Sequence, residues 1–248
     1  DQSSVGEITA AVSRLRTIRI LAPDGRVGIG AFSVAVGPAV LAAVSPIHGE
    51  QADFLRLVGG YHDHVRTLTY FTTGYFEVEG AVEFRAPDAY GKWVYALGNA
   101  QRLRDPGDRQ ALSRYVRAEL EQAGSADPML LERLSPAGRS VYELIVNEDP
   151  ARVPRLIAAL PPWLQEEIEA LDLAGTDLDG FSGKCILVHG LDDTVIPYTE
   201  SVSLAEAFGQ CDTTLYLLEG LQHVDRKFNG LDTWRFWRTL SQLMAQRK

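Results

Sequence analysis

The sequence predicts an α/β protein with a parallel β-sheet and a mostly helical insertion. Two observations predict this class. At both ends of the chain, over residues 1–60 and 181–248, short apolar strand-like stretches alternate with helical stretches. The residues between them, 61–180, carry helical patterns broken by Pro and Gly, without a strong strand signal. We therefore expect a core made of the two end segments, with a helical cap inserted between them.

The first segment predicts two strands, each next to a helix. Residues 7–21 carry apolar side chains at spacings of three and four, which predicts an amphipathic helix. Residues 27–32 predict a buried strand, 34–43 a helix of small residues, and 53–58 a second strand followed by paired glycines. This order indicates a parallel sheet, because parallel neighbours need a crossover connection.

The last segment continues the same alternation. Residues 184–189 and 213–218 predict the third and fourth strands, and residues 198–209 predict a helix between them. Residues 231–246 predict a closing helix. We therefore expect about four recognisable strands in one parallel sheet.

Composition excludes several classes of protein. The 248 residues are 46% hydrophobic and 23% charged, an ordinary globular balance, and they suffice for a core domain with an insertion. No apolar run approaches the ~18 residues that suggest a membrane-spanning helix, so we expect a soluble protein. The net charge of −9, without a basic stripe, argues against nucleic acid as a partner.

The start of the chain and its cysteines bear on location. The first residues lack a basic and then apolar segment, so we expect no signal peptide and a cytoplasmic protein. The first residue is Asp1 rather than Met, which we interpret as a processed, trimmed or cut N-terminus. Cys185 and Cys211 are too few for a disulfide framework and have no metal-binding spacing.

Polar residues follow three of the predicted strands. Ser33, Asp193 and His223 each stand at the carboxyl end of a strand. In an open parallel sheet this edge is where ligands bind. The three side chains are therefore expected to meet at one site.

The segments around these residues resemble the α/β-hydrolase family. LVHGLDDTVIPYTES resembles the family's acid-bearing segment, in which the catalytic Asp stands three residues after a Gly and four before a Pro; here it is Asp193. LLEGLQHVD resembles the segment after the last strand and carries the family's catalytic His at His223. VGIGAFSVAVGPAVLAA resembles the nucleophile elbow, with Ser33 as its serine. The resemblance covers residues 7–60 and 184–246.

The elbow departs from the family pattern at two positions. It normally reads Gly-x-Ser-x-Gly, because the nucleophile lies in a strained turn where flanking side chains would clash. Here Ala31 and Ala35 replace the two glycines. Alanine is the smallest substitute, so the sequence remains compatible with the turn.

The resemblance implies a serine hydrolase that needs no cofactor and acts on a carboxylic ester or related acyl bond of a small molecule. Ser33 would be the nucleophile, His223 the base and Asp193 the residue that orients the base. The backbone N–H of Val34 would supply one oxyanion-hole donor. Each of these three residues also has a purely structural interpretation. Ser33 would be an N-cap, Asp193 a carboxylate at the start of a helix, and His223 a histidine in a surface loop.

A second group of titratable residues follows the second strand. His62 and His64 flank Asp63, a pattern that suggests a metal site. Such a site needs three or four ligands, and His48 is the only nearby addition. We therefore expect no metal ion here, and we expect these residues to line the mouth of the pocket.

The family places about four strands before the elbow, with a loop that supplies the second oxyanion donor. Only 32 residues precede Ser33, and apart from the strand at 27–32, which leads into the elbow, none of them predicts a strand. Two interpretations stay open. The chain is part of a hydrolase whose first half is absent, or it is a degenerate scaffold that serves as a non-catalytic binding or interaction protein.

Without those strands, residues 27–32 form an edge of the sheet. An apolar edge strand with unpaired backbone groups invites pairing with another chain. We therefore expect this edge to be covered by the chain's own N-terminal segment, by a second copy in a homodimer, or by a missing N-terminal segment.

Overall fold

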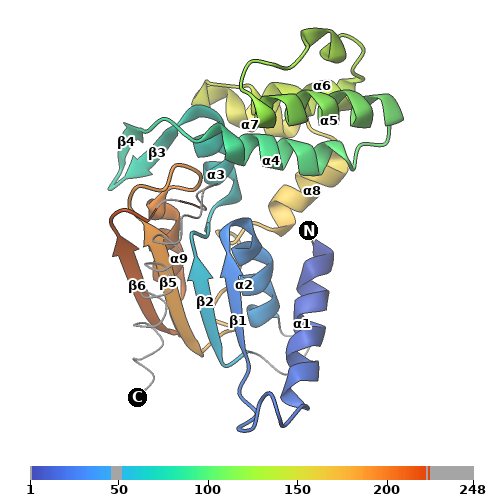
Figure 1. Cartoon of the computed structure of the whole chain (residues 1–248). Helices are drawn as coiled ribbons and strands as arrows, with labels where there is room; N and C mark the ends of the chain where they lie inside the picture. The colour runs from blue at the N-terminus through green and yellow to red at the C-terminus, as the bar shows by residue number, and fades with distance from the viewer. Residues whose placement is uncertain (1, 46–51, 222, 224–248) are drawn as a thin grey trace.

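The computed structural model describes residues 2–45, 52–221 and 223 of the chain. Its centre is a four-stranded parallel sheet in the order β1-β2-β5-β6 (Figure 1). The pairings between these neighbours are all parallel. The predicted class, an α/β protein with four parallel strands, is confirmed. The strands span Gly28–Phe32 (β1), Phe54–Val58 (β2), Lys184–Gly190 (β5) and Asp212–Leu218 (β6).

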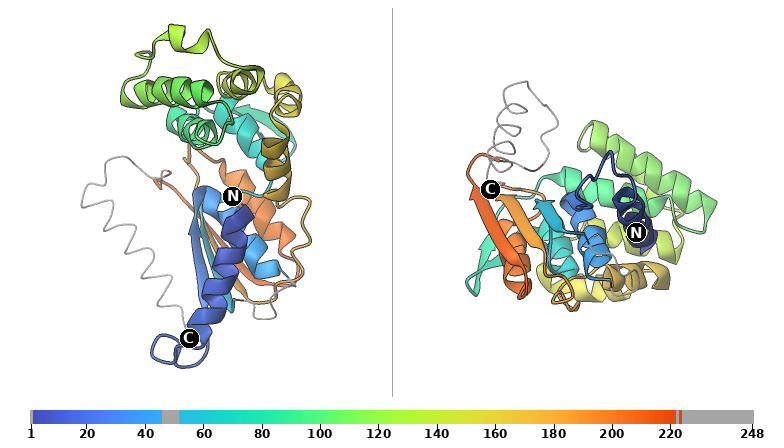
Figure 2. Two further views of the ribbon diagram at one scale, coloured as in Figure 1. Left: turned by 90° about the vertical axis from the view of Figure 1, so that its right-hand side faces the viewer. Right: turned by 90° about the horizontal axis from the view of Figure 1, so that it is seen from below.

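The middle strands are the most buried part of the sheet. Leu57 of β2 lies beside Leu187 of β5, and both side chains are at most 1% exposed. Helices α2 (Val36–Val44) and α9 (Tyr198–Ala207) cover one face of the sheet (Figure 2) and share a buried cluster with these leucines. Removing this apolar surface from water is the main force that holds the helices on the sheet.

A second set of elements, which we call the cap, lies over the carboxyl ends of the strands (Figure 1). It begins with helix α3 (His64–Thr73) and an antiparallel hairpin of β3 (Tyr75–Val78) and β4 (Ala81–Phe84). Further helices follow, namely α4 (Ala89–Ala100), α5 (Pro106–Glu121), α6 (Pro136–Ile145), α7 (Val153–Ala158) and α8 (Pro162–Ala170).

The cap has a hydrophobic core of its own. One buried cluster joins its helices, with members such as Leu68, Trp93, Leu112, Val141 and Leu164. The cluster beneath the sheet is separate from it. An inserted cap needs a hydrophobic core separate from that of the sheet, and the two clusters meet this requirement. The boundaries of the cap at residues 61 and 180 stay a prediction.

Aspartate side chains fix where several cap helices begin. Asp63, Asp88 and Asp105 each precede a helix, and each carboxylate accepts a backbone N–H of the first turn. These bonds satisfy donors that have no partner inside the helix. Helix α3 ends at Gly74, whose φ of 80° is a left-handed conformation that glycine adopts without steric cost.

The hairpin corrects the expectation that the middle of the chain carries no strand. Its turn residues Glu79 and Gly80 have φ values of 51° and 82°. Two consecutive positive φ values are typical of a type I′ turn, whose twist matches that of antiparallel strands. Both strands have only four residues, too few for a clear alternating pattern, and all four residues of β4 are exposed although three of them are apolar.

The first helix, α1, spans Gln2–Arg16, so the prediction of a helix over residues 7–21 is wrong at both ends. Leu21 continues the apolar spacing of the helix but is 65% exposed. Spacing predicts a helix only where the apolar face is buried, because packing supplies most of a helix's stability.

The remaining helical predictions have three outcomes. The predicted helix at 34–43 begins as a 3₁₀ turn, Ser33–Ala35, and continues as α2. The predicted helix at 198–209 is confirmed as α9, while the one at 231–246 lies outside the described residues. Within the described ranges, none of the helices has the length and apolar character needed to cross a membrane.

Strand β1 is an edge of the sheet that the structure describes, as predicted. The N-terminal helix α1 packs against its start, where Val12 and Val27 belong to one small buried cluster. At the other end of the strand, Phe32 is 49% exposed. The chain's own N-terminal segment therefore covers part of β1, and a homodimer or a further segment over the rest stays a prediction.

One contact between core and cap gives a stability prediction. A Cβ at Gly37 of α2 would overlap the hydroxyl of Tyr61, which is buried and donates to the carbonyl of Leu171. We expect Gly37→Ala to lower the free energy of unfolding by about 2 kcal/mol, the scale of overpacking a core. Urea denaturation measures the change.

The matched control is Gly98→Ala in α4, where a Cβ meets no atom within 4 Å. This change should raise stability by roughly 0.5–1 kcal/mol, because alanine is the better helix former. Equal effects of the two substitutions would show that the close approach at Gly37 has no energetic weight.

Candidate active site

Ser33 lies in a sharp turn between β1 and the helix that follows it. Phe32 before it is extended, with φ −129° and ψ 143°, whereas Ser33 itself has a φ of 54°. A positive φ is strained for a residue with a Cβ, and it turns the serine side chain out of the strand–helix junction. The predicted strand–turn–helix arrangement is therefore present at Ser33.

The alanines beside Ser33 fit this turn. Ala35 has an ordinary right-handed helical conformation, with φ −71° and ψ −11°, and its side chain is exposed. A methyl group at this position therefore meets no crowding from the core. Ala31 is buried inside β1, within the hydrophobic cluster of the sheet. In this turn only Ser33 has a positive φ. The backbone conformations at Ala31 and Ala35 therefore do not require glycine.

The three candidate residues meet in one hydrogen-bonded chain. Nε2 of His223 lies 2.8 Å from Oγ of Ser33, and Nδ1 of the same ring lies 2.6 Å from Oδ2 of Asp193. The geometric expectation that the ring reaches both partners is confirmed. Phe32, rather than Ser33, occupies the N-cap position of the turn, so the serine hydroxyl faces the histidine instead of capping a helix. We call Ser33, His223 and Asp193 the candidate triad.

Asp193 is held as a buried anion. Its side chain is 3% exposed, and Oδ1 accepts the backbone N–H groups of Val195 and Ile196 at 2.8 and 3.0 Å. Burial raises the pKa of this carboxyl, but hydrogen bonds from His189 and His223 outweigh burial and lower the pKa to about 2. The carboxylate therefore stays ionised throughout the neutral range and holds Nδ1–H of His223 as a donor.

The cap holds the backbone of the loop that carries Asp193. Nη1 of Arg85, just after β4, donates to the carbonyls of Leu191 and Asp193 at 2.6 and 3.4 Å. The hydroxyl of Tyr70 on α3 donates to the same Asp193 carbonyl at 3.3 Å. Burial raises the pKa of Tyr70 to about 12, so this hydroxyl keeps its proton and remains a donor.

Two glycines follow β2 where the chain passes α2 and His223. Gly59 has a φ of 59°, which favours glycine, and a Cβ there would be in ordinary contact with the ring of His223, at 3.4 Å. A Cβ at Gly60 would lie 2.6 Å from Val36 of α2, closer than real side chains approach. Gly60 therefore lets the end of β2 lie close to α2, while Gly59 supplies the left-handed turn beside the ring.

The predicted oxyanion donor, Val34, directly follows Ser33 in the 3₁₀ turn. Its side chain is 60% exposed, so no buried packing obstructs this side of the turn. A backbone N–H in the first turn of a helix points away from the helix body and is favoured as an anion donor. The role of Val34 stays a prediction.

The histidines after β2 are held by backbone hydrogen bonds and ring packing, whereas Nδ1 of both His62 and His64 is buried and has no hydrogen-bond partner among the described residues. The backbone N–H groups of His62 and Asp63 both donate to the buried carboxylate of Glu200, at 2.9 and 2.7 Å. The ring of His64 packs beside Tyr61, with 5.1 Å between ring centroids. Among the described residues, no group of three or more His, Cys, Asp or Glu side chains is arranged to hold a metal. The third suggested ligand, residue 48, lies outside that part of the chain.

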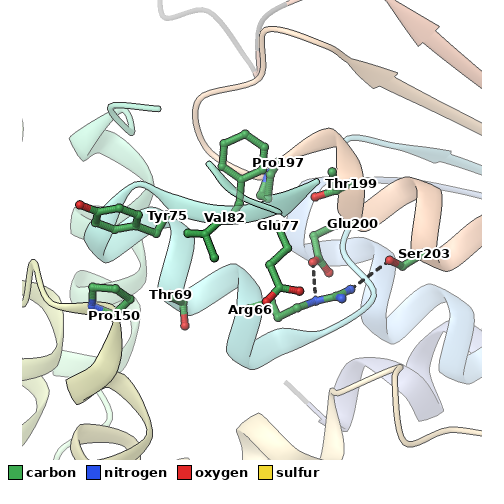
Figure 3. Close-up of a pocket in the computed structure, with 11 residues that line it drawn as sticks. Arg66, Thr69, Tyr75, Glu77, Val82, Pro150, Pro197, Thr199, Glu200 and Ser203 are labelled. Atoms are coloured by element: carbon green, nitrogen blue, oxygen red, sulfur yellow. Dashed lines mark hydrogen bonds and ion pairs between the residues drawn. The ribbon is translucent and has the colours of Figure 1, made fainter. Parts of the chain in front are cut away.

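A cavity of about 250 Å³ opens between the hairpin, α3 and α9 (Figure 3). Glu200 and Arg66 form an ion pair at 3.0 Å inside it, and Arg66 also donates to Ser203. No member of the candidate triad is among its lining residues. This cavity is therefore distinct from the hydrogen-bonded chain at Ser33.

Sequence reasoning missed four residues of the site. Gly59, Tyr70, Arg85 and His189 all contact the candidate triad or the loop that carries its aspartate. Two of them had a visible signal: Gly59 is the first of the paired glycines after the second predicted strand, and His189 stands in the His-Gly pair at the end of the third. Tyr70 and Arg85 lie more than a hundred positions from Asp193, and no local pattern links them to it.

Solved structures similar to this chain include several hydrolases. A meta-cleavage product hydrolase from Pseudomonas fluorescens IP01 is 18% identical, with 93% of this chain and 69% of that chain covered and a TM-score of 0.43. A thermophilic esterase from Thermogutta terrifontis is 14% identical, with coverage of 96% and 72% and a TM-score of 0.44. An α/β-hydrolase superfamily protein from Enterococcus faecalis is 16% identical, with coverage of 98% and 72% and a TM-score of 0.45. No family model and no curated protein matches the chain.

The strain at Ser33 gives a prediction that does not depend on activity. Ser33→Gly and Ser33→Ala both remove the hydroxyl that bonds His223, but only glycine adopts a φ of 54° without cost. We expect the glycine variant to be more stable than the alanine variant by about 1 kcal/mol. Urea denaturation of the two proteins measures the difference, and equal stabilities would contradict a strained turn.

Proposed function

We propose that this chain, with its α/β-hydrolase-type sheet, is a serine hydrolase that cleaves a carboxylic ester or related acyl bond of a small molecule. The observation that carries the proposal is the hydrogen-bonded chain Ser33–His223–Asp193. Its members come from three separate segments of the sequence and meet at the carboxyl edge of the sheet. Acyl transfer to a serine requires a nucleophile, a base next to it and an anion that orients the base. The contacts from Ser33 to His223 and from His223 to Asp193 follow this order.

In the first half-reaction, Oγ of Ser33 attacks the acyl carbon while its proton passes to Nε2 of His223. The carbonyl oxygen becomes an oxyanion, which the N–H of Val34 would stabilise. The bond to the leaving alkoxide then breaks, and that oxygen takes the proton from Nε2. An acyl-serine and a free alcohol result, and His223 is neutral again.

In the second half-reaction, water replaces the alcohol. His223 takes a proton from the water, the hydroxide adds to the acyl carbon, and the collapsing intermediate returns a proton to Oγ of Ser33. Throughout, anionic Asp193 stabilises the positive charge that His223 carries in each intermediate. The carboxylate does not accept the proton, because its pKa of about 2 makes it the weaker base.

The direct test combines labelling with hydrolysis. We expect the protein to cleave p-nitrophenyl acetate and to be labelled by a fluorophosphonate at the peptide that carries Ser33. Ser33→Ala should remove both, because no hydroxyl remains next to His223. The matched control is Ser125→Ala, an exposed serine in a cap loop, which should leave both unchanged. Labelling of Ser33 is read by mass spectrometry.

Two outcomes would contradict the proposal. Hydrolysis that survives Ser33→Ala would place the nucleophile elsewhere. A folded wild-type protein that neither hydrolyses the ester nor reacts with the phosphonate would favour a non-catalytic binding protein on the same scaffold.

The pH dependence of kcat/KM provides a second prediction. His223 must be neutral to accept the serine proton, so activity should rise with pH on the acid side. Asp193, with a pKa of about 2, is already ionised there and adds no second proton. The acid limb of log kcat/KM should therefore approach a slope of one, about tenfold per pH unit. A slope of two would show that a second group, such as the Asp193 carboxyl, also has to ionise.

A further inference from the structure

A second histidine contacts the carboxylate of Asp193. His189 lies near the end of β5, and its ring is fully buried. Its Nε2 lies 3.3 Å from Oδ2 of Asp193 and 3.0 Å from the carbonyl oxygen of Ile196. Its Nδ1 lies 2.6 Å from the hydroxyl of Ser201 on α9. The ring therefore bridges the strand, the acid-bearing loop and the helix that follows it.

The neighbours of the ring fix its protonation pattern. Both atoms near Nε2, a carbonyl oxygen and a carboxylate oxygen, can only accept hydrogen bonds. Nε2 therefore carries the proton and donates. In a neutral ring Nδ1 then accepts, and the Ser201 hydroxyl is its donor. The acceptors at Nε2 thus set the tautomer in which His189 faces Asp193 with an N–H, and the Ser201 hydroxyl adapts to it as the donor to Nδ1.

Asp193 holds its two histidines unequally. The 2.6 Å distance from Oδ2 to Nδ1 of His223 is that of a short, charge-assisted bond. The 3.3 Å distance from the same oxygen to His189 is that of a longer, shared contact. The stronger contact therefore belongs to the member of the candidate triad, and the weaker one comes from a ring that is itself locked by Ser201 and Ile196.

We propose that His189 is a positioning residue that aims the Asp193 carboxylate at His223. This inference rests on the proposed function and deepens it by adding a residue that acts through Asp193. Neutral His189 donates Nε2–H to Oδ2, while its second contact, with the Ile196 carbonyl, fixes the loop that supplies the N–H groups on Oδ1. The carboxylate can then neither rotate away from His223 nor take up a proton when the base becomes charged.

Two substitutions separate positioning from packing. In His189→Gln the longer side chain places an N–H₂ near the former Nε2, so the donor to Asp193 is kept. In His189→Asn the shorter amide reaches only the former Nδ1 and faces Ser201, so that donor is lost. Both variants put an uncharged amide in the same strand, which makes each the control for the other.

We expect His189→Gln to keep kcat for p-nitrophenyl acetate within about threefold, and His189→Asn to lower kcat by roughly a hundredfold with little change in KM. The proton NMR signal of the His223 Nδ1–H should stay far downfield in the first variant and move upfield in the second. This signal reports the bond to Asp193 directly. Equal losses in both variants, or no loss in either, would overturn the proposal.

The NMR signal also separates this inference from the proposed function. If the wild-type protein shows no hydrolysis and no phosphonate labelling, the proposed function fails, yet the signal still tests whether His189 positions Asp193. If His189→Asn does not fold, His189→Leu takes its place, because its apolar side chain fills part of the ring's volume and carries no donor. An unshifted His223 signal in His189→Leu would likewise overturn the proposal.

Discussion

The Asp193 carboxylate is the charge on which the rest of the site depends. It is almost completely buried, and such a charge is costly unless donors surround it. Two backbone N–H groups of its own loop bind one oxygen, and two imidazole rings contact the other. Because these donors belong to β5, to the loop after it and to the segment after β6, satisfying one anion fixes three parts of the chain relative to each other.

The same residue links the sheet to the cap through its backbone. Arg85 and Tyr70 both donate to the Asp193 carbonyl, from the two ends of the segment that contains the hairpin. Arg85 also lies over the ring of Phe76, which fixes the guanidinium beneath the hairpin. A two-stranded hairpin has little stability of its own, so its anchor on the acid-bearing loop is part of what orders it. Cap and site are therefore coupled through peptide carbonyls rather than through side chains of the candidate triad.

Sequence predicts the parts of this structure that are set by local pattern. The strand over residues 184–189 is confirmed to within a residue, because its centre, 185–188, is apolar and it lies between two neighbouring strands. The resemblance of the segment around Gly190 and Pro197 to a known acid-bearing segment singles out Asp193, and this carboxylate does contact His223. The hairpin was missed because each of its strands has only four residues, too few for a clear alternating pattern. The contacts of Tyr70 and Arg85 were missed because they depend on how the cap packs on the sheet. Contacts between residues far apart in the sequence leave no periodic pattern of apolar residues from which they could be predicted.

The alanines on either side of Ser33 show which positions near the turn require glycine and which do not. Ser33 alone has a positive φ in the turn, and the residue two positions later is exposed and ordinarily helical, so a methyl group fits there. Close approach is required instead around the turn. Gly37 of α2 approaches the Tyr61 hydroxyl and Gly60 approaches Val36 of α2 too closely for a Cβ, while Gly59 has a left-handed conformation beside the His223 ring. The positions that need glycine therefore lie on the neighbouring helix and after the neighbouring strand, rather than next to Ser33.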